Sequence, residues 1–168
     1  MLPRKPNYPD AKSADPFEDG LEFQDFVCEA LARHGIILQN FMSRKFQWSK
    51  GENIQGWEIK LDQRCTETRR MSIEVAEKSS CEVRFWTRSG IFSPVDPWLY
   101  IQGNRELVAI FSTRWLRRYH DEKNPKIHEN RPTVQSFFIP IKFVRNHAVK
   151  IIEGDDLLYA PRLSRAAA

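Results

Sequence analysis

Charged and apolar side chains alternate in two short stretches near the middle of the chain. Residues 57–62 read WEIKLD and residues 71–78 read MSIEVAEK, and this period of two is typical of β-strands. One face of the two stretches then holds Glu58, Lys60, Asp62, Glu74 and Lys78. Clustered carboxylates repel one another, and a hard cation such as Mg²⁺ relieves the repulsion by taking oxygen ligands from them.

The charged face of these stretches could hydrolyse a phosphodiester. A lysine beside a bound metal can orient or help to deprotonate a water molecule, and the metal lowers the pKa of that water and stabilises charge on the attacked phosphate. A simpler interpretation is a charged hairpin, because opposite charges paired across two strands stabilise a hairpin by about 0.2–1 kcal/mol. The pattern alone leaves both interpretations open.

Five segments of the chain together resemble a family of small phage-associated and bacterial proteins assigned to the PD-(D/E)xK nuclease superfamily. The segments are GLEFQDFV, GENIQGWEIKLD, TETRRMSIEVAEKS, RSGIFSPVDPWLYIQGN and FFIPI, and the similarity extends from about Pro9 to Ile152. The resemblance implies a metal-dependent nuclease that uses Mg²⁺ or Mn²⁺ and cleaves DNA, with RNA as the weaker alternative. Because such enzymes often need two active sites for two strands, it is also compatible with a homodimer.

The resemblance also implies roles for the two strand acids. Glu58 matches the first acid of the superfamily, and Glu74 matches the acid of its acid-x-Lys motif. The chain departs from that motif at Ala76, which stands in the lysine position. At period two, Lys78 on the same strand or Lys60 on the neighbouring strand could replace this lysine. A broken motif equally fits an inactive relative that acts as a nucleic-acid-binding or protein-interaction module.

Further candidates come from the helix and the turns around these strands. In the superfamily the opening helix often supplies another polar residue to the metal centre, and Gln24 matches that position, with Glu22 as the alternative. Asp62 is a candidate third metal ligand. The cations that could grip a nucleic-acid phosphate are Lys50, Arg64, Arg69 and Arg70. As exposed residues they could equally contribute nothing measurable.

The composition predicts one domain of ordinary globular type. The chain has 168 residues and a net charge of +4, and its cations cluster in the later half, which suits a polyanionic partner. No run approaches the roughly 18 apolar residues of a spanning helix, and no secretory signal is visible, so we expect a cytoplasmic protein without a membrane partner. The three widely spaced cysteines fit reduced thiols.

We expect an α/β fold of the restriction-endonuclease-like type, in which a central mixed sheet is flanked by helices. Its αβββαβ core would contain an inserted hairpin. The expected division is an irregular arm at 1–16, one domain at 17–153 and a loose tail at 154–168. The expected helices are 16–34, 113–119 and 142–152, and the expected strands are 36–41, 57–62, 71–78, 98–101, 107–111 and 136–141. Residues 79–96 are expected to form a hairpin or flap over the sheet.

Overall fold

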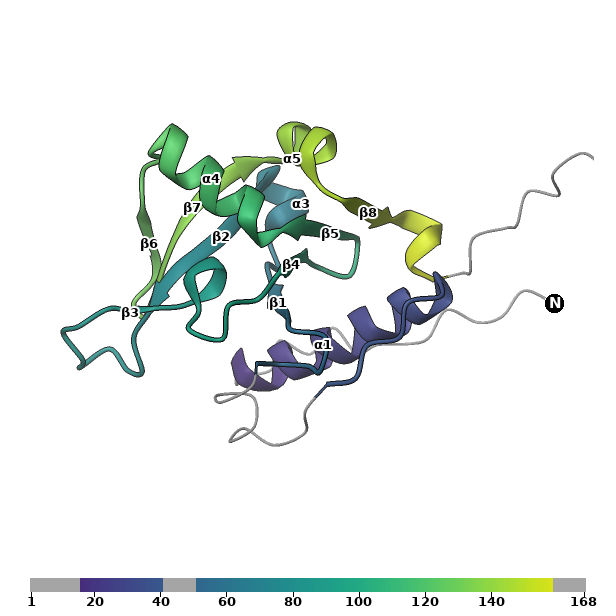
Figure 1. The fold of residues 1–168 in the computed structure, drawn as a ribbon, viewed down its shortest axis with the longest axis horizontal. Coiled ribbons are helices and arrows are strands. Elements are labelled where there is room, and N and C mark those ends of the chain that lie inside the picture. Colours follow the sequence, from purple (N-terminus) through teal and green to yellow (C-terminus); the bar gives the residue numbers. More distant parts are fainter. Residues whose placement is uncertain (1–15, 41–50, 159–168) are drawn as a thin grey trace, which may run out of the picture.

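The computed structural model describes residues 16–40 and 51–158 and has an α/β architecture (Figure 1). The predicted arm before residue 16, the predicted tail after residue 158 and Lys50 lie outside the described residues. Across the described ranges, no helix combines the length and the apolar character that crossing a membrane requires.

Helix α1 (Pro16–Arg33) lies against one face of the first sheet. Phe23, Val27 and Leu31 recur at helical spacing, and all three are buried against this sheet. The chain leaves the helix at Gly35, whose φ of +76° is a left-handed conformation that glycine adopts without a steric penalty. The predicted helix at 16–34 is therefore confirmed to within one residue.

The first sheet has four strands in the order β1-β4-β5-β8. They are β1 (Trp57–Leu61), β4 (Leu99–Gly103), β5 (Leu107–Ser112) and β8 (Lys150–Glu153). Strand β1 runs parallel to β4, and the other pairs are antiparallel, so the sheet is mixed. One face of the sheet presents Ile59, Ile101 and Ile110 to the core that it shares with α1.

The second sheet also has four strands, in the order β3-β2-β7-β6. They are β2 (Arg70–Glu77), β3 (Thr87–Arg88), β6 (His128–Arg131) and β7 (Val134–Pro140), and all their pairings are antiparallel. Its apolar residues, such as Ile73 and Phe137, form a second core with Phe111 of the first sheet. Helices α4 (Thr113–Lys123) and α5 (Ile141–His147) add Leu116 and Val144 to this core.

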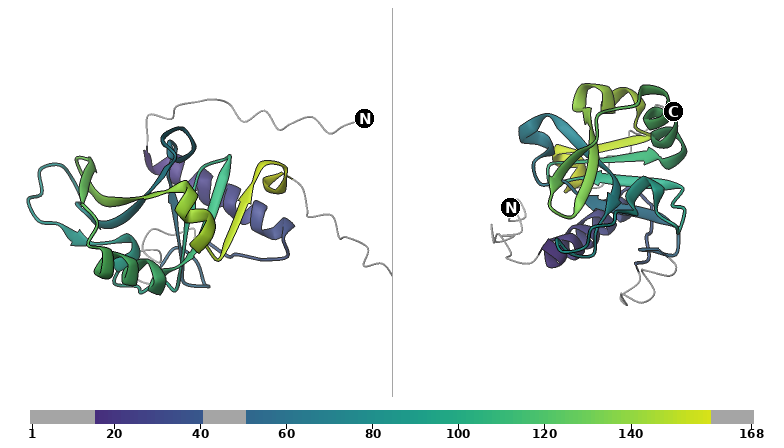
Figure 2. Two further views of the ribbon diagram at one scale, coloured as in Figure 1. Left: turned by 90° about the horizontal axis from the view of Figure 1, so that it is seen from above. Right: turned by 90° about the vertical axis from the view of Figure 1, so that its left-hand side faces the viewer.

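Three short helical segments complete the part of the chain that the structure describes. Helix α3 (Cys65–Thr68) connects β1 to β2, η1 (Gly90–Phe92) packs on β2, and η2 (Gly154–Leu157) follows β8. Figure 1 and the right-hand view of Figure 2 place α1 on one side of the sheets and α4 and α5 on the opposite side. The strands are thus enclosed between helices, as the α/β prediction requires.

The predicted pairing of the two charged strands is wrong, and the predicted single central sheet is two sheets. Strand β1 pairs with β4, whereas β2 pairs with β7 and β3. Strand β2 is apolar along one face and joins the core between the sheets through Met71, Ile73 and Val75, so burial drives it toward β7. Both strands nevertheless contribute side chains to the lining of one cavity, described below.

Three other sequence predictions need correction. Residues 36–40 form no strand among the described residues, only an isolated bridge between Asn40 and Asn53. The helix predicted at 142–152 ends at His147, and the chain continues as β8. The amide of Val149 donates to the carbonyl of Ile110, and this bond starts the pairing of β8 with β5. The helix predicted at 113–119 extends to Lys123, and strand β6 follows it.

Candidate functional site

A cavity of about 960 Å³ lies between the two sheets and the first turns of α1. Strand β1 contributes Glu58 and Lys60 to its lining, β2 contributes Glu74, and β4 contributes Tyr100 and Gln102. Its volume falls in the range of pockets that bind small molecules or single residues of a polymer. The charged faces of β1 and β2 both line the cavity, although the two strands belong to different sheets.

Lys60 lies between the two strand acids. Its Nζ is 3.0 Å from Oε1 of Glu58 and 3.4 Å from Oε1 of Glu74. Only 8% of the Glu58 side chain and 12% of the Glu74 side chain is exposed to solvent. Because side chains alternate along β1, Glu58 and Lys60 face the cavity while Ile59 is buried against α1. Three of the predicted site residues are therefore in direct contact.

Lys78, the alternative lysine, does not line the cavity. The pairing of β2 with β7 shifts by one residue between Glu74 and Ala76, which is a β-bulge. Beyond the bulge the two faces exchange, so Glu77 lines the cavity and Lys78 lies with its Nζ 4.2 Å from the centre of the Trp86 ring. The expectation that Lys78 shares the face of Glu74 is thus wrong. Ala76 is buried in the second core, where a lysine would place its charge among apolar side chains.

Electrostatic coupling keeps Lys60 charged. Burial by itself lowers the pKa of Lys60, but the carboxylates of Glu58, Glu74 and Glu52 outweigh it and hold the pKa well above its usual range. The lysine is therefore an ammonium ion at neutral pH and cannot accept a proton. Tyr100 lies beside it, and burial followed by the Glu74 charge raises the pKa of this phenol well above its usual value.

Glu52 is a third acid near the pair, and its sequence position gave no periodic signal. Its Oε2 accepts a hydrogen bond from the Ile59 amide at 2.6 Å. Burial and then the charge of Glu58 raise the pKa of Glu52 well above its ordinary value of 4.5. The residue precedes β1 in a turn, where no alternation of apolar and polar side chains marks it.

Asp62 and Gln24 line the same cavity. Asp62 Oδ2 accepts a hydrogen bond from the Ser72 amide at 2.8 Å, and this bond connects the end of β1 to β2. Burial raises the pKa of Asp62 above its ordinary value. Gln24 is a buried residue of α1, 8% exposed, and reaches the cavity from the helix side. Both predicted residues therefore accompany the Lys60 cluster.

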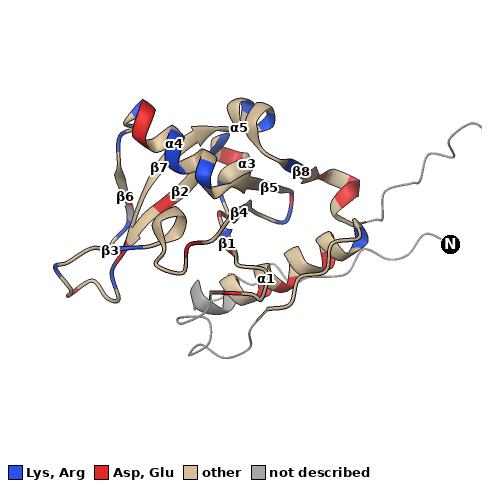
Figure 3. Ribbon diagram, viewed as in Figure 1, with Lys and Arg blue, Asp and Glu red and all other residues tan. Residues whose placement is uncertain are grey.

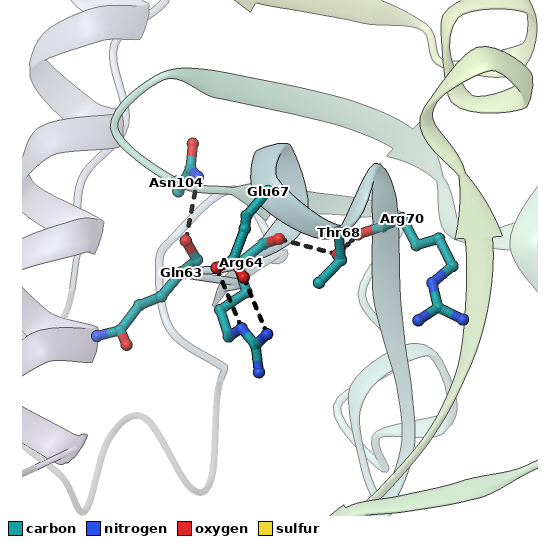
Figure 4. Close-up of polar contacts among 6 residues, drawn as sticks. All are labelled: Gln63, Arg64, Glu67, Thr68, Arg70 and Asn104. Atoms are coloured by element: carbon teal, nitrogen blue, oxygen red, sulfur yellow. Dashed lines mark hydrogen bonds and ion pairs between the residues drawn. The ribbon is translucent and has the colours of Figure 1, made fainter.

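The predicted phosphate-binding arginines divide into two groups. Arg64 and Arg70 line the cavity, and Arg64 also forms an ion pair of 3.0 Å with Glu67 in α3 (Figure 4). Arg69 ends α3 in a left-handed conformation and borders a separate groove. Sequence reasoning missed Arg88 of β3 and Arg131 of β6, which line the cavity from the second sheet because of long-range strand pairing.

The oxygen-rich lining fits a hard cation in part. Within residues 16–40 and 51–158, no group of three or more His, Cys, Asp or Glu side chains is arranged to hold a metal ion. Mg²⁺, however, is commonly bound by one or two carboxylates together with water and substrate phosphate. Glu74 Oε1 and Gln102 Oε1 are buried without a hydrogen-bond donor, and Glu74 Oε1 has only its ion pair with Lys60. These oxygens are suitable acceptors for a bound cation or its waters.

Gly90 determines how closely η1 approaches Glu74. A Cβ at Gly90 would lie 2.3 Å from the Glu74 carbonyl oxygen, and the φ of Gly90 is +55°. We expect Gly90→Ala to destabilise the protein by about 2–4 kcal/mol, since it adds a backbone clash to a left-handed conformation. Gly154→Ala is the matched control, because its φ is +58° but its Cβ would meet open space. Chemical denaturation measures both values, and equal losses would show that the Glu74 contact is unimportant.

Glu52 makes the stability of the protein depend on pH. Because its pKa is raised in the folded state, the fold keeps a proton that the unfolded chain loses above about pH 4.5. Stability should therefore fall as pH rises from 4.5 toward the folded pKa, by at most about 1.4 kcal/mol per pH unit. In Glu52→Gln this fall should be smaller. Urea denaturation between about pH 4.5 and 8 without metal tests this, and parallel wild-type and variant curves would contradict it.

Glu67→Gln is the control for this pH series. Its hydrogen bond and ion pair with Arg64 lower the pKa of the exposed Glu67 below 4.5. Its contribution to stability is present above the unfolded pKa and is lost only as pH falls further. The slope of stability against pH above 4.5 should therefore match that of the wild-type protein.

Comparisons of the chain with known proteins found no match. No family model, no curated protein and no solved structure matches it.

Proposed function

We propose that the protein is a metal-dependent nuclease of the restriction-endonuclease-like type that hydrolyses phosphodiester bonds in DNA. The main support is the Lys60 ammonium held between the carboxylates of Glu58 and Glu74 inside a cavity. Anionic and cationic groups that converge in a shielded cavity are the usual means of handling charged phosphates. The order of α1, β1 and β2 along the chain also agrees with the resemblance, which implies an opening helix and an acid on each of two strands.

Glu58 and Glu74 would hold Mg²⁺ or Mn²⁺, with Asp62 as a further candidate. When bound, such a metal lowers the pKa of a coordinated water and stabilises negative charge on the phosphate. Gln24 would contribute a hydrogen-bonding side chain to the metal site from α1, because it is buried at the same cavity.

Lys60 would act as a fixed positive charge. Since it stays protonated, it would donate hydrogen bonds to a phosphate oxygen or to the attacking water and would not remove a proton. Because the pKa of Glu52 is raised, this carboxyl keeps its proton to a higher pH than an ordinary glutamate and is a candidate proton donor. Arg64, Arg70 and Arg88 would bind neighbouring phosphates at the cavity lining.

A non-enzymatic module is the second candidate function, and one observation favours it. The Lys60 ammonium already offsets part of the negative charge of Glu58 and Glu74, so the two acids depend less on a metal ion for stability. A protein that has lost catalysis could keep this arrangement and use the surrounding arginines only to bind nucleic acid.

Metal binding and cleavage by the wild-type protein separate the two candidates. Thermal unfolding is followed during titration with Mg²⁺ and Mn²⁺, in parallel with cleavage of labelled single-stranded, duplex and branched DNA. The nuclease predicts a metal-dependent rise in melting temperature and metal-dependent cleavage. Nucleic-acid binding without stabilisation by metal and without cleavage of any substrate would overturn it in favour of the module.

A further inference from the structure

Residues 78–88, here called the flap, leave the second sheet next to the cavity. The flap extends away from the body of the molecule between β2 and β3 (Figure 1). Its base is fixed by the pairing of Ala76 with Arg88 and of Glu77 with Thr87. The amide of Lys78 also donates to the carbonyl of Thr133, so the start of the flap is attached to the β6–β7 turn.

The two aromatic residues of the flap, Phe85 and Trp86, lie in the sequence between the cations Arg84 and Arg88. Lys78 lies over the ring of Trp86, with its Nζ 4.2 Å from the ring centre. Arg88 lies over the ring of Phe92, with its Cζ 4.6 Å from the ring centre. The flap has three cations against the single carboxylate of Glu82, and Figure 3 shows its Lys and Arg segments. A positive surface with interleaved rings is the composition of binding sites for single-stranded nucleic acid.

Phe85 is the most exposed large apolar side chain of the described residues, with 83% of its surface in contact with solvent. Exposure of an apolar phenylalanine ring to water is unfavourable, and the ring can be covered by stacking on another flat ring. Arg84, the preceding residue, is exposed as well and can accompany it with a positive charge. The two side chains together offer one ring face and one phosphate contact.

The end of the flap is part of the cavity. Thr87, Arg88 and Ser89 all line it. Phe85 is two residues before Thr87, which is at most about 7 Å along an extended chain. Ser89 Oγ is buried without a hydrogen-bond partner and belongs to the same lining. A polymeric ligand that has one residue in the cavity can therefore reach the Phe85 ring with the next residue.

We propose that the flap binds single-stranded nucleic acid beside the cavity, with the Phe85 ring stacked on a base next to the phosphate that the cavity receives. The inference rests on the proposed nuclease function for the position of that phosphate. A single strand is favoured over a duplex because a duplex base has both faces covered by its neighbours and offers no free face to Phe85. Arg88, at the junction of flap and cavity, would hold the intervening phosphate.

The test compares Phe85→Leu with Phe85→Trp in the full chain. Leucine keeps an apolar side chain but removes the ring, whereas tryptophan keeps a stacking surface. Binding of fluorescent single-stranded and duplex DNA of equal length is measured in EDTA, where cleavage is prevented. Val149→Ala, at another exposed apolar position, is the control for surface changes. Stacking should also quench 2-aminopurine placed in the strand.

We expect Phe85→Leu to bind the single strand about tenfold more weakly, with duplex binding unchanged, and Phe85→Trp to bind like the wild-type protein. Unchanged single-strand binding by Phe85→Leu would overturn the flap proposal, as would equal losses for the single strand and the duplex. Because these measurements contain no metal, they are independent of catalysis. A wild-type protein that binds through Phe85 but never cleaves with Mg²⁺ or Mn²⁺ would overturn the nuclease and leave the flap.

Discussion

Replacing Glu74 by Gln should lower metal-dependent DNA cleavage by at least about 100-fold while leaving the fold nearly unchanged. Substitutions beside a metal-bound residue commonly cost 10- to 100-fold, so the loss of a charged ligand itself should cost at least as much. Glutamine has the shape of glutamate but no charge to attract a divalent cation. The metal-dependent rise in melting temperature should therefore disappear together with the cleavage.

The fold should survive this substitution because the backbone around Glu74 makes its own contacts. The Glu74 amide donates to the Tyr100 hydroxyl at 3.3 Å, and the residue pairs with Ser136 in β7. Lys60 loses the longer of its two ion pairs, at 3.4 Å, and keeps the one of 3.0 Å with Glu58. Cleavage rates measured during Mg²⁺ titration report the activity of the variant, and urea denaturation reports its stability.

Glu129→Gln is a suitable control for Glu74→Gln. Glu129 is also a strand glutamate of the second sheet, and its carboxylate accepts a hydrogen bond from Gln135 at an exposed edge. The same chemical change there should leave cleavage and metal stabilisation at their wild-type levels. If Glu74→Gln cleaves as fast as Glu129→Gln, the assignment of Glu74 as a metal ligand is wrong.

Local sequence patterns predicted elements whose determinants are close in the chain. Helix α1 has its apolar stripe and Gly35 within one segment, and the β4–β5 hairpin closes over a short turn. The N-cap of α4 was likewise predictable, since the Ser112 side chain accepts a hydrogen bond from the Trp115 amide. The partner of each strand was not predictable from local patterns, because the pairing of β1 with β4 and of β2 with β7 depends on residues distant in sequence.

The candidate site was predictable only as far as the period of two holds. Glu58, Lys60 and Glu74 face one cavity because both strands keep their alternation up to Glu74. The bulge that follows has no glycine or proline to mark it, so the exchange of faces at Lys78 left no signal in the sequence. Glu52 lies in a turn and was missed because its contact with β1 is an irregular side-chain bond to the Ile59 amide.

Replacing Lys60 and Lys78 one at a time should show which of them acts as the lysine of the acid-x-Lys motif. We expect Lys60→Met to lower cleavage at least about 100-fold, and Lys78→Met to cleave at the wild-type rate when substrate is saturating. Lys60 contacts both acids, whereas Lys78 lies over the Trp86 ring outside the cavity. Losing the Lys78 contact should cost only about 0.5–1 kcal/mol of stability.

Stability provides an independent readout of the same pair. Without Lys60, the buried carboxylates of Glu58 and Glu74 lose their counter-charge. This loss should cost about 3 kcal/mol at pH 7, which is the low end for a broken buried ion pair, because a quarter of the Lys60 side chain is exposed to solvent. Mg²⁺ should restore part of the lost stability by replacing the ammonium as counter-charge. If Lys78→Met abolished cleavage and Lys60→Met did not, the ammonium between the two acids would have only a structural role.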